Sequence, residues 1–401
     1  MLTTAEARAA IFDAMPEFPA ETVPSNRAVG AILRQTVVAE RDQPPFDRVM
    51  MDGIAIRHAE FAGGQRAFPV QAIQAAGDAS LTLEAGHCIE IMTGAALPRH
   101  ADCIVPVERI SLVDGVATLE DGYDAQARQF IHARASDHAS GAALLTPRKR
   151  ILPMDAAIIA SAGLTDVAVS RAPVISIIAT GNELVEAGAP IDAHQIRLSN
   201  SPAIHAMLEQ HGYGTVTQEH LVDEVGLMRE RIASHLANAD VLILSGGVSM
   251  GKADFVPQVL SDLGVEVVFH RVSQRPGKPM WFGLGPQQQA VFALPGNPVS
   301  ALVCCRQYVI PALDSAATAM EPLPEFASLA TDVTFEPDLT CFQPVRVLSS
   351  SGAQILAVPV TTNTSGDFTA LSATDGYVEL DREQSHFPAG TVVMLHRWQS
   401  V

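Results

Sequence analysis

The first residues of the chain show hydrophobic positions at helical spacing. Ala7 and Ile11 share one face of a helix predicted over residues 3–15, which Pro16 ends. The same kind of spacing predicts a second short helix over residues 25–40. The chain is therefore expected to begin with helical structure.

Residues 44–135 have a different character. Prolines and glycines interrupt them, and short runs typical of strands lie between, such as IEIMT (89–93) and DCIVPV (102–107). This stretch therefore predicts a β-rich module. A helical pattern returns over residues 153–164.

From Pro173 onwards, continuous apolar runs alternate with amphipathic segments. The runs VISIIAT (174–180), VLIL (241–244) and AVFAL (290–294) fit strands buried on both faces. Helices are predicted over residues 201–211 (with Ser201 as the cap), 224–237, 256–263 and 298–311, and further strands over 215–221, 265–272 and 280–284. This alternation predicts βαβ units, a mostly parallel sheet and helices on both of its faces.

After about residue 320 the helical patterns stop. Glycine turns separate short strand-like runs as far as Val401, which predicts a small β-barrel or sandwich. The predicted fold class is α/β plus β-rich modules in one multidomain chain. It comprises a three-layer αβα domain, a β-rich insertion domain and a C-terminal β-barrel.

Composition narrows the classes of function. The chain has 401 residues, of which 48% are hydrophobic and 17% charged, which excludes a largely disordered protein. Its formal charge of −18 disfavours nucleic acid and anionic membranes as partners. An anionic ligand would therefore need a local basic pocket or a ring of backbone N–H groups.

The cysteines and the N-terminus point to a reducing compartment. The five cysteines form no CxxC or CxxH pair, which disfavours a structural zinc site. The N-terminus lacks the apolar core of a signal peptide, and no segment has about 18 consecutive apolar residues. We therefore expect a cytoplasmic protein with no membrane contact.

A glycine-rich loop follows the apolar run VLIL. In SGGVSMGKADF (245–255), Gly246 and Gly247 allow a sharp turn and a close backbone approach, and Ser245 and Ser249 add hydroxyl groups. Such a loop before a helix makes a phosphate or oxyanion cradle, or alternatively a tight turn without a ligand. It matches neither a P-loop nor a GxGxxG fingerprint, which disfavours nucleoside triphosphates and dinucleotides.

A second loop follows the run AVFAL. In ALPGNPVSAL (293–302), Pro295 and Pro298 stiffen the turn, and Ser300 falls in the first helical turn. Asn297 either caps the helix or faces a ligand. The alternative is an ordinary strand-to-helix connection.

Basic residues cluster between two predicted strands. HRVSQRPGKP (270–279) carries Arg271, Arg275 and Lys278 in a chain with an excess of acidic residues. The segment is a candidate anion site, and a solvated basic surface is the alternative.

Acidic residues occupy two further positions of interest. Asp52 precedes Gly53 in FDRVMMDGIAIR (46–57), where it serves the turn or acts in a cleft with another domain. Glu183 comes directly after the first buried strand, and together with Asp254 it could bind Mg²⁺. The alternative is that these acids are ordinary surface residues.

Seven motifs in order resemble the molybdopterin molybdenumtransferase family, which includes MoeA and the gephyrin E-domain. They are FDRVMMDGIAIR, IMTGAALP (91–98), ATGNEL (179–184), LSGGVSMGKADF (244–255), RPGKP (275–279), LPGNPVSA (294–301) and SGDFTALSATDGY (365–377). Each motif is weak alone, but the ordered set is specific and spans residues 44 to about 380.

The resemblance implies an elongated homodimer of four-part protomers. The parts are residues 1–24 with 172–318 (α/β domain, similar to molybdopterin adenylyltransferase), 25–43 with 138–171 (helical and extended linker), 44–137 (β-rich domain) and 319–401 (barrel). It also implies that adenylylated molybdopterin and molybdate react to give molybdenum cofactor and AMP, with Mg²⁺. The active site would lie between the α/β domain of one protomer and the β-rich domain of the other.

The resemblance also assigns roles. The catalytic residues would be Asp52, Thr93, Asp137 and Glu183, and the metal ligands Glu183 and Asp254. Substrate and anion binding would fall to Ser245, Gly246, Gly247, Ser249, Arg271, Arg275, Lys278, Pro295, Asn297, Pro298 and Ser300. Molybdopterin adenylyltransferase and molybdoenzyme maturation proteins are the further partners it suggests.

The chain departs from the family pattern at a few positions. The family commonly has acids where this chain has Asn182 and Leu198, and Ala135 and Ser136 precede Asp137 in a modified turn. Two alternatives therefore stay open: a non-catalytic homologue acting as a scaffold or ligand-binding protein, and an adenylyltransferase acting one step earlier. The β-rich parts argue against the second.

Overall fold

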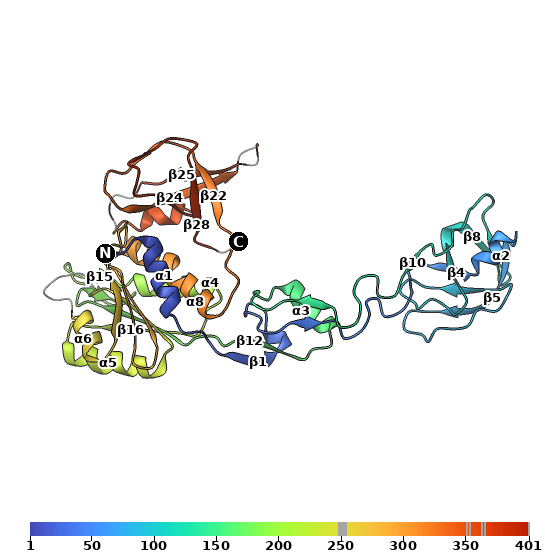
Figure 1. Ribbon diagram of the computed structural model, residues 1–401, viewed down its shortest axis with the longest axis horizontal. Coiled ribbons are helices and arrows are strands. Elements are labelled where there is room, and N and C mark those ends of the chain that lie inside the picture. The colour runs from blue at the N-terminus through green and yellow to red at the C-terminus, as the bar shows by residue number, and fades with distance from the viewer. Residues whose placement is uncertain (248–254, 350–351, 353, 362–363, 365, 400–401) are drawn as a thin grey trace.

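The computed structural model describes residues 1–401 except 248–254, 350–351, 353, 362–363, 365 and 400–401. The molecule is elongated (Figure 1). The α/β part and the C-terminal part lie together at one end, and a β-rich domain lies at the other, beyond a narrow waist.

A six-stranded sheet forms the centre of the α/β part, in the order β16-β13-β17-β21-β20-β18. Its first four strands are parallel: β16 (Val216–Leu221), β13 (Ile175–Thr180), β17 (Val241–Ser245) and β21 (Ala290–Leu294). β20 (Trp281–Leu284) and β18 (Glu266–His270) are antiparallel. The predicted mostly parallel sheet is confirmed.

Helices cover both faces of this sheet. One face packs against α1 (Thr4–Ala14), α4 (Asn200–Gln210), α7 (Pro298–Cys304) and α8 (Ile310–Ala316), with a π-helical stretch (Cys305–Val309) joining the last two. The other face packs against α5 (Val225–Asn238) and α6 (Val256–Asp262). Ile177 faces the first layer and Ile178 the second, as strand alternation requires. The predicted three-layer arrangement is confirmed.

The β-rich domain at the far end has its own six-stranded sheet, in the order β7-β4-β6-β5-β9-β8. The strands are β4 (Gly53–Ile56), β5 (Ala67–Gln74), β6 (Cys88–Ile91), β7 (Cys103–Pro106), β8 (Ile110–Val113) and β9 (Val116–Leu119), with α2 (His58–Ala62) beside them. Both faces are covered, because Ile54 and Ala55 belong to separate buried clusters.

Short antiparallel pairs build the waist. β1 (Ala20–Pro24) pairs with β12 (Asp166–Ser170), β2 (Val37–Val38) with β11 (Ala143–Leu145), and β3 (Arg48–Val49) with β10 (Ile131–His132), near α3 (Pro153–Ser161). The helix predicted over residues 25–40 is wrong. Only Ser25–Arg27 form a 3₁₀ turn, Gly30 takes a φ of +92°, and Leu33 bridges to Val169. The local pattern of residues 25–40 fits either a helix or an extended segment, and pairing with distant residues decides for the extended one.

The C-terminal part forms a closed barrel. Its strands are β22 (Glu325–Leu329), β24 (Thr340–Ser349), β25 (Ile355–Pro359), β26 (Gly376–Leu380) and β28 (Val392–Arg397), and the additional pairing of β24 with β26 closes it. β23 (Val333–Thr334) and β27 (His386–Phe387) pair separately. β19 (Gln274–Arg275), from the α/β part, extends the barrel along β24.

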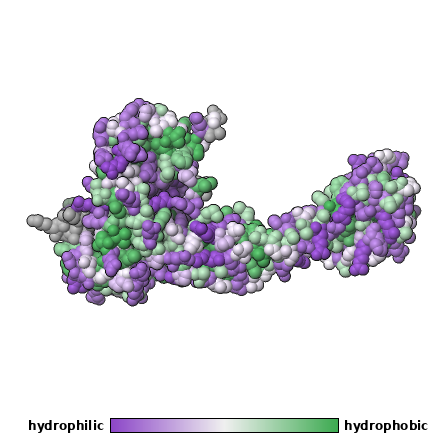
Figure 2. All heavy atoms as spheres, viewed as in Figure 1, coloured by the Kyte–Doolittle hydropathy of each residue, from purple (hydrophilic) through white to green (hydrophobic). Residues whose placement is uncertain are grey.

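Hydrophobic side chains are exposed on the outside of this barrel. Figure 2 shows them beside β22 and β28, where Phe326 is 50% and Val392 66% exposed. Contiguous apolar surface of this kind is typical of an interaction site. Among the described residues, no helix has the length and apolar character needed to cross a bilayer.

Candidate active site

Two of the loops singled out in the sequence lie side by side. β17 and β21 are parallel neighbours, with Ser245 opposite Leu294, so the loops after them leave the same edge of the sheet. The backbone N–H of Gly246 donates to the Leu294 carbonyl at 3.2 Å. Both loops therefore lie at the same edge of the sheet.

The glycine-rich loop packs directly on the end of β13. Gly246 and Gly247 have φ values of +98° and +64°. A Cβ on Gly246 would lie 2.6 Å from the Thr180 carbonyl oxygen, and one on Gly247 would lie 2.8 Å from a methyl group of Val256. Glycine is therefore required at both positions. Ser249 and Asp254 lie outside the described residues.

Asn200 ties the two loops together. Its side-chain Nδ2 donates to Ser245 Oγ at 2.9 Å and to the Gly296 carbonyl at 2.8 Å. Asn200 is not among the predicted site residues, because the predicted helix started at Ser201. That cap is wrong, since Ser199 is the N-cap and α4 begins at Asn200.

Three polar atoms at this edge are buried without a hydrogen-bond partner among the described residues: Thr180 Oγ1, Asn200 Oδ1 and Ser201 Oγ. Thr180 is 3% and Ser201 1% exposed. Such groups normally find a partner, because leaving one unsatisfied in the interior costs about 1–3 kcal/mol. Their gathering where the loops meet indicates a site for a ligand with both donors and acceptors.

Acidic residues border the same edge. Glu183 follows β13, and its carboxylate lies over Gly181. Asp223, which the sequence analysis did not single out, follows β16, the neighbour of β13. Asn182 and Asp223 are linked reciprocally, each backbone N–H donating to the other side chain: Asp223 N donates to Asn182 Oδ1 at 2.9 Å, and Asn182 N donates to Asp223 Oδ2 at 3.4 Å.

Proteins bind Mg²⁺ through one or two carboxylates together with substrate phosphates and water, so the carboxylates of Glu183 and Asp223 fit the ion. No group of three or more candidate metal-binding side chains gathers anywhere in the described part of the chain. Mg²⁺, which keeps several waters and bridges to substrate phosphates, does not require one.

Leu198 is the second position at which the chain departs from the family pattern. Its backbone N–H donates to the Val185 carbonyl, next to the short strand pair of β14 (Leu184–Val185) and β15 (Ile196–Arg197).

The basic segment lies at this edge too. It connects β18 to β20, and Trp281 at the start of β20 is opposite Ala293 near the end of β21. A Cβ on Gly277 would collide with Cys304 Sγ, so the turn is packed on α7. Lys278 and Arg275 are exposed, whereas Arg271 is half-buried. The backbone N–H of Arg271 donates to the Met280 carbonyl.

The start of α7 completes the edge. Pro298 is its first residue, and Asn297 takes the N-cap position without a side-chain capping bond. Pro295 is buried, and Ser300 is 4% exposed. The helix therefore presents its N-terminal N–H groups and its positive dipole end to the two loops, as an anion site needs.

The remaining predicted residues lie in and beside the far β-rich domain. Thr93 donates to Asp52 Oδ1 twice, from its backbone N–H at 2.6 Å and from its hydroxyl at 2.8 Å. These bonds, the backbone one first, lower the pKa of the Asp52 carboxyl below its ordinary value. Asp52 is therefore a fixed carboxylate.

Asp137 belongs to a separate series of hydrogen-bonded side chains. Arg48 is only a donor, so His132 accepts from it at Nδ1 (3.0 Å) and donates from Nε2 to Asp137 Oδ1 (2.9 Å).

The structure therefore divides the predicted site residues into two groups. Figure 1 places β4, which follows Asp52, at the opposite end of the molecule from β16 and the α/β sheet. One chain alone does not bring Asp52, Thr93 and Asp137 to the loops after β13, β17 and β21.

The five cysteines are structural. All are buried and free of disulfides. Burial raises the pKa of Cys103, Cys305 and Cys341 to about 12, so these thiols stay protonated at neutral pH.

Three family models together match most of the chain. They are "MoeA N-terminal region (domain I and II)" over residues 2–163, "Probable molybdopterin binding domain" over residues 176–315, and "MoeA C-terminal region (domain IV)" over residues 327–398. The order is the one expected from the motifs.

Similar proteins agree along their whole length. The molybdopterin molybdenumtransferase of Synechocystis sp. is 38% identical over 405 residues, covering 99% of this chain and 100% of that protein. That of Staphylococcus aureus (strain MRSA252) is 30% identical, covering 97% and 93%. The crystal structure of a molybdopterin biosynthesis MoeA protein from Pyrococcus horikosii has a TM-score of 0.84 at 26% identity, covering 100% of both chains. The chain therefore belongs to the molybdopterin molybdenumtransferase (MoeA) family.

Proposed function

We propose that this protein inserts molybdenum into molybdopterin. Adenylylated molybdopterin and molybdate are the substrates, and molybdenum cofactor and AMP are the products. The observation that carries the proposal is the oxyanion cradle at the carboxyl ends of β17 and β21, which Asn200 holds together. Full-length similarity to molybdopterin molybdenumtransferases supports it.

The chemistry of the cradle suits these substrates. Molybdate and both phosphates are anions, which backbone N–H groups, Lys278 and Arg275 can bind. Glu183 and Asp223 would hold Mg²⁺, with Asp254 as the further predicted ligand. When bound, the ion supplies charge neutralisation at the phosphoanhydride. No covalent nucleophile is needed, because the sulfurs of the substrate bind the metal.

The active unit in this proposal is a homodimer. The β-rich domain of one protomer would reach the α/β cradle of the other and bring Asp52 to the substrate. The separation of the two residue groups within one chain supports this arrangement. The exposed apolar surface beside β22 and β28 supports self-association. The domain boundaries given above, a cytoplasmic location and an upstream adenylyltransferase partner belong to the same proposal.

The test is a reconstituted reaction. Purified protein is incubated with adenylylated molybdopterin, Mg²⁺ and molybdate, and AMP release and cofactor formation are measured together. The proposal requires both products, and both must depend on molybdate. AMP release without cofactor formation, or neither product, would contradict it.

We expect sedimentation at micromolar concentration to give a species of twice the 42.5-kDa chain mass. The reason is that Asp52 lies far from the cradle of the same chain, so a monomer would not bring the two together. Detection of the single chain alone, under conditions that support activity, would rule out the shared site.

Thr93→Val is expected to move the acid limb of the pH–activity profile to higher pH. The variant removes one of the two hydrogen bonds that lower the pKa of Asp52. Losing this bond raises the pKa of Asp52 relative to the wild type. The carboxylate is therefore protonated at a higher pH, and activity falls sooner as the pH is lowered. An acid limb that stays in place would show that Asp52 does not control it.

A further inference from the structure

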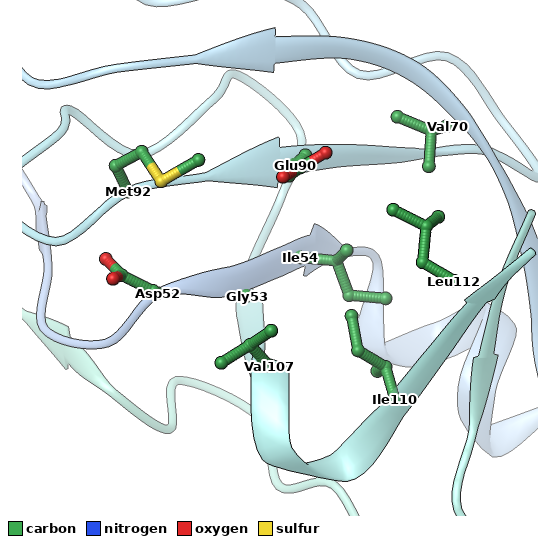
Figure 3. Close-up of a pocket in the computed structure, with 9 residues that line it drawn as sticks. All are labelled: Asp52, Gly53, Ile54, Val70, Glu90, Met92, Val107, Ile110 and Leu112. Atoms are coloured by element: carbon green, nitrogen blue, oxygen red, sulfur yellow. The ribbon is translucent and has the colours of Figure 1, made fainter. Parts of the chain in front are cut away.

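A pocket of about 290 Å³ opens in the β-rich domain beside Asp52 (Figure 3). Ile54 and Val70 from the sheet and Val107, Ile110 and Leu112 from the segment after β7 form its apolar walls. The Asp52 carbonyl accepts from the Val107 N–H at 2.9 Å, which fixes this wall beside the acid. The volume suits a small ring system rather than a whole nucleotide.

One carboxylate in this pocket is unexplained by the fold. Glu90 projects from β6 opposite Ile54, on the sheet face that also carries Cys88 and the domain core. It is half-buried, and within the described ranges its carboxylate makes no hydrogen bond and no ion pair. Burial, followed by the negative charge of Glu90, raises the pKa of Cys88 to about 12.

The occupant must satisfy Glu90. An apolar side chain from a second subunit would bury the carboxylate without a partner, which is unfavourable. Phosphate or molybdate would be repelled, because Asp52 and Glu90 are the charged side chains lining the pocket. A flat ring with two adjacent N–H donors fits, since a carboxylate can accept both bonds and the apolar walls can cover the ring faces.

We propose that this pocket binds the pterin ring of the substrate, with Glu90 accepting from the ring N–H and the neighbouring amino group of its 2-amino-4-oxopyrimidine edge. The proposal rests on the proposed function for the identity of the substrate. It places the sulfur-bearing end of the molecule on the side of Asp52, and leaves the phosphate end for the cradle of the α/β domain. Glu90 is then a specificity residue that the sequence motifs do not include.

The test uses free pterin (2-amino-4-oxopteridine) as the probe and the full chain as the receptor. Binding is followed by the fluorescence of the probe. We expect saturable binding to the wild type and an affinity about ten- to a hundredfold lower for Glu90→Gln, because a charge-assisted pair of hydrogen bonds is lost. Glu84→Gln, which changes an exposed carboxylate of the same domain, should bind like the wild type.

A second measurement needs no variant. Lumazine (2,4-dioxopteridine) has the same shape but lacks the 2-amino donor, so the wild type should bind it more weakly than pterin by a similar factor. Glu90→Gln should lose most of this preference, because the carboxylate that reads the donor is gone.

The outcomes separate this inference from the proposed function. AMP binding should be unchanged in Glu90→Gln, and the KM for adenylylated molybdopterin should rise. If the wild type binds pterin through Glu90 but releases no AMP, the pocket stands and the proposed function fails. Equal pterin affinity of wild type and Glu90→Gln, no preference over lumazine, or a change of oligomeric state in Glu90→Gln would each overturn the pocket.

Discussion

Replacing Asp52 with alanine is expected to lower turnover by about a hundredfold or more, with substrate affinity changed far less. Both Thr93 hydrogen bonds go to Oδ1, so Oδ2 has no hydrogen bond within the described part of the chain. An ionised carboxylate that is held in place by one oxygen, with the other oxygen unbonded, is suited to act on a bound substrate. Little of the fold depends on its side chain beyond the Thr93 contact.

The measurement is single-turnover AMP release, with AMP affinity determined by calorimetry. Glu108→Ala is the matched control, because it removes another exposed carboxylate of the same domain. The control should keep wild-type turnover. Wild-type turnover in Asp52→Ala would remove the main acid from the proposed shared site.

Replacing Lys278 with alanine is expected to weaken ligand binding by about ten- to a hundredfold while leaving the melting temperature almost unchanged. The lysine is exposed, and its side chain makes no hydrogen bond or ion pair with the described residues. Its charge is therefore available to an anion, and a hydrogen bond to a charged group contributes roughly 1.5–3 kcal/mol. Surface substitutions of this type usually change stability by no more than about 0.5 kcal/mol.

Arg275→Ala provides the contrast. The Arg275 guanidinium lies 6.0 Å from the centre of the Phe335 ring, and β19 pairs with the barrel strand β24. This variant should lose both affinity and thermal stability, because the arginine also joins two parts of the molecule. Calorimetry with AMP and thermal unfolding measure the two effects. Normal binding by Lys278→Ala together with a large drop in melting temperature would make the lysine structural and the anion-site assignment wrong.

The elements of the α/β part could be predicted because their patterns have one interpretation. Ile175–Thr180 and Val241–Ser245 are mostly apolar, and a strand buried on both faces is the simple explanation. Residues 25–40 lacked that clarity. Leu33 is buried, as a helical face requires, but Val29 is 50% exposed, and the segment is held by pairing with residues more than a hundred positions away.

The site was predicted where it depends on the local chain and missed where it depends on neighbouring strands. Gly246 and Gly247 indicate a sharp turn in the sequence itself, because only glycine fits at these positions. Asn200 and Asp223 looked like ordinary helix and loop residues. Asp223 lies just after the parallel strand β16, a position that marks it as a site candidate. Asn200 is the first residue of α4, and only the packing of that helix start against the loops after β17 and β21 gives it a role.

Mixing two inactive variants shows whether two protomers share one active site. Asp52→Ala and Lys278→Ala homodimers are dissociated, combined in equal amounts and reassociated, and AMP release is measured below saturating substrate. In each mixed dimer one site receives Asp52 from one chain and Lys278 from the other, so random mixing should restore roughly a quarter of the wild-type activity. If the mixture stays as inactive as its two components although mixed dimers have formed, the site lies within one chain and the shared-site account is wrong.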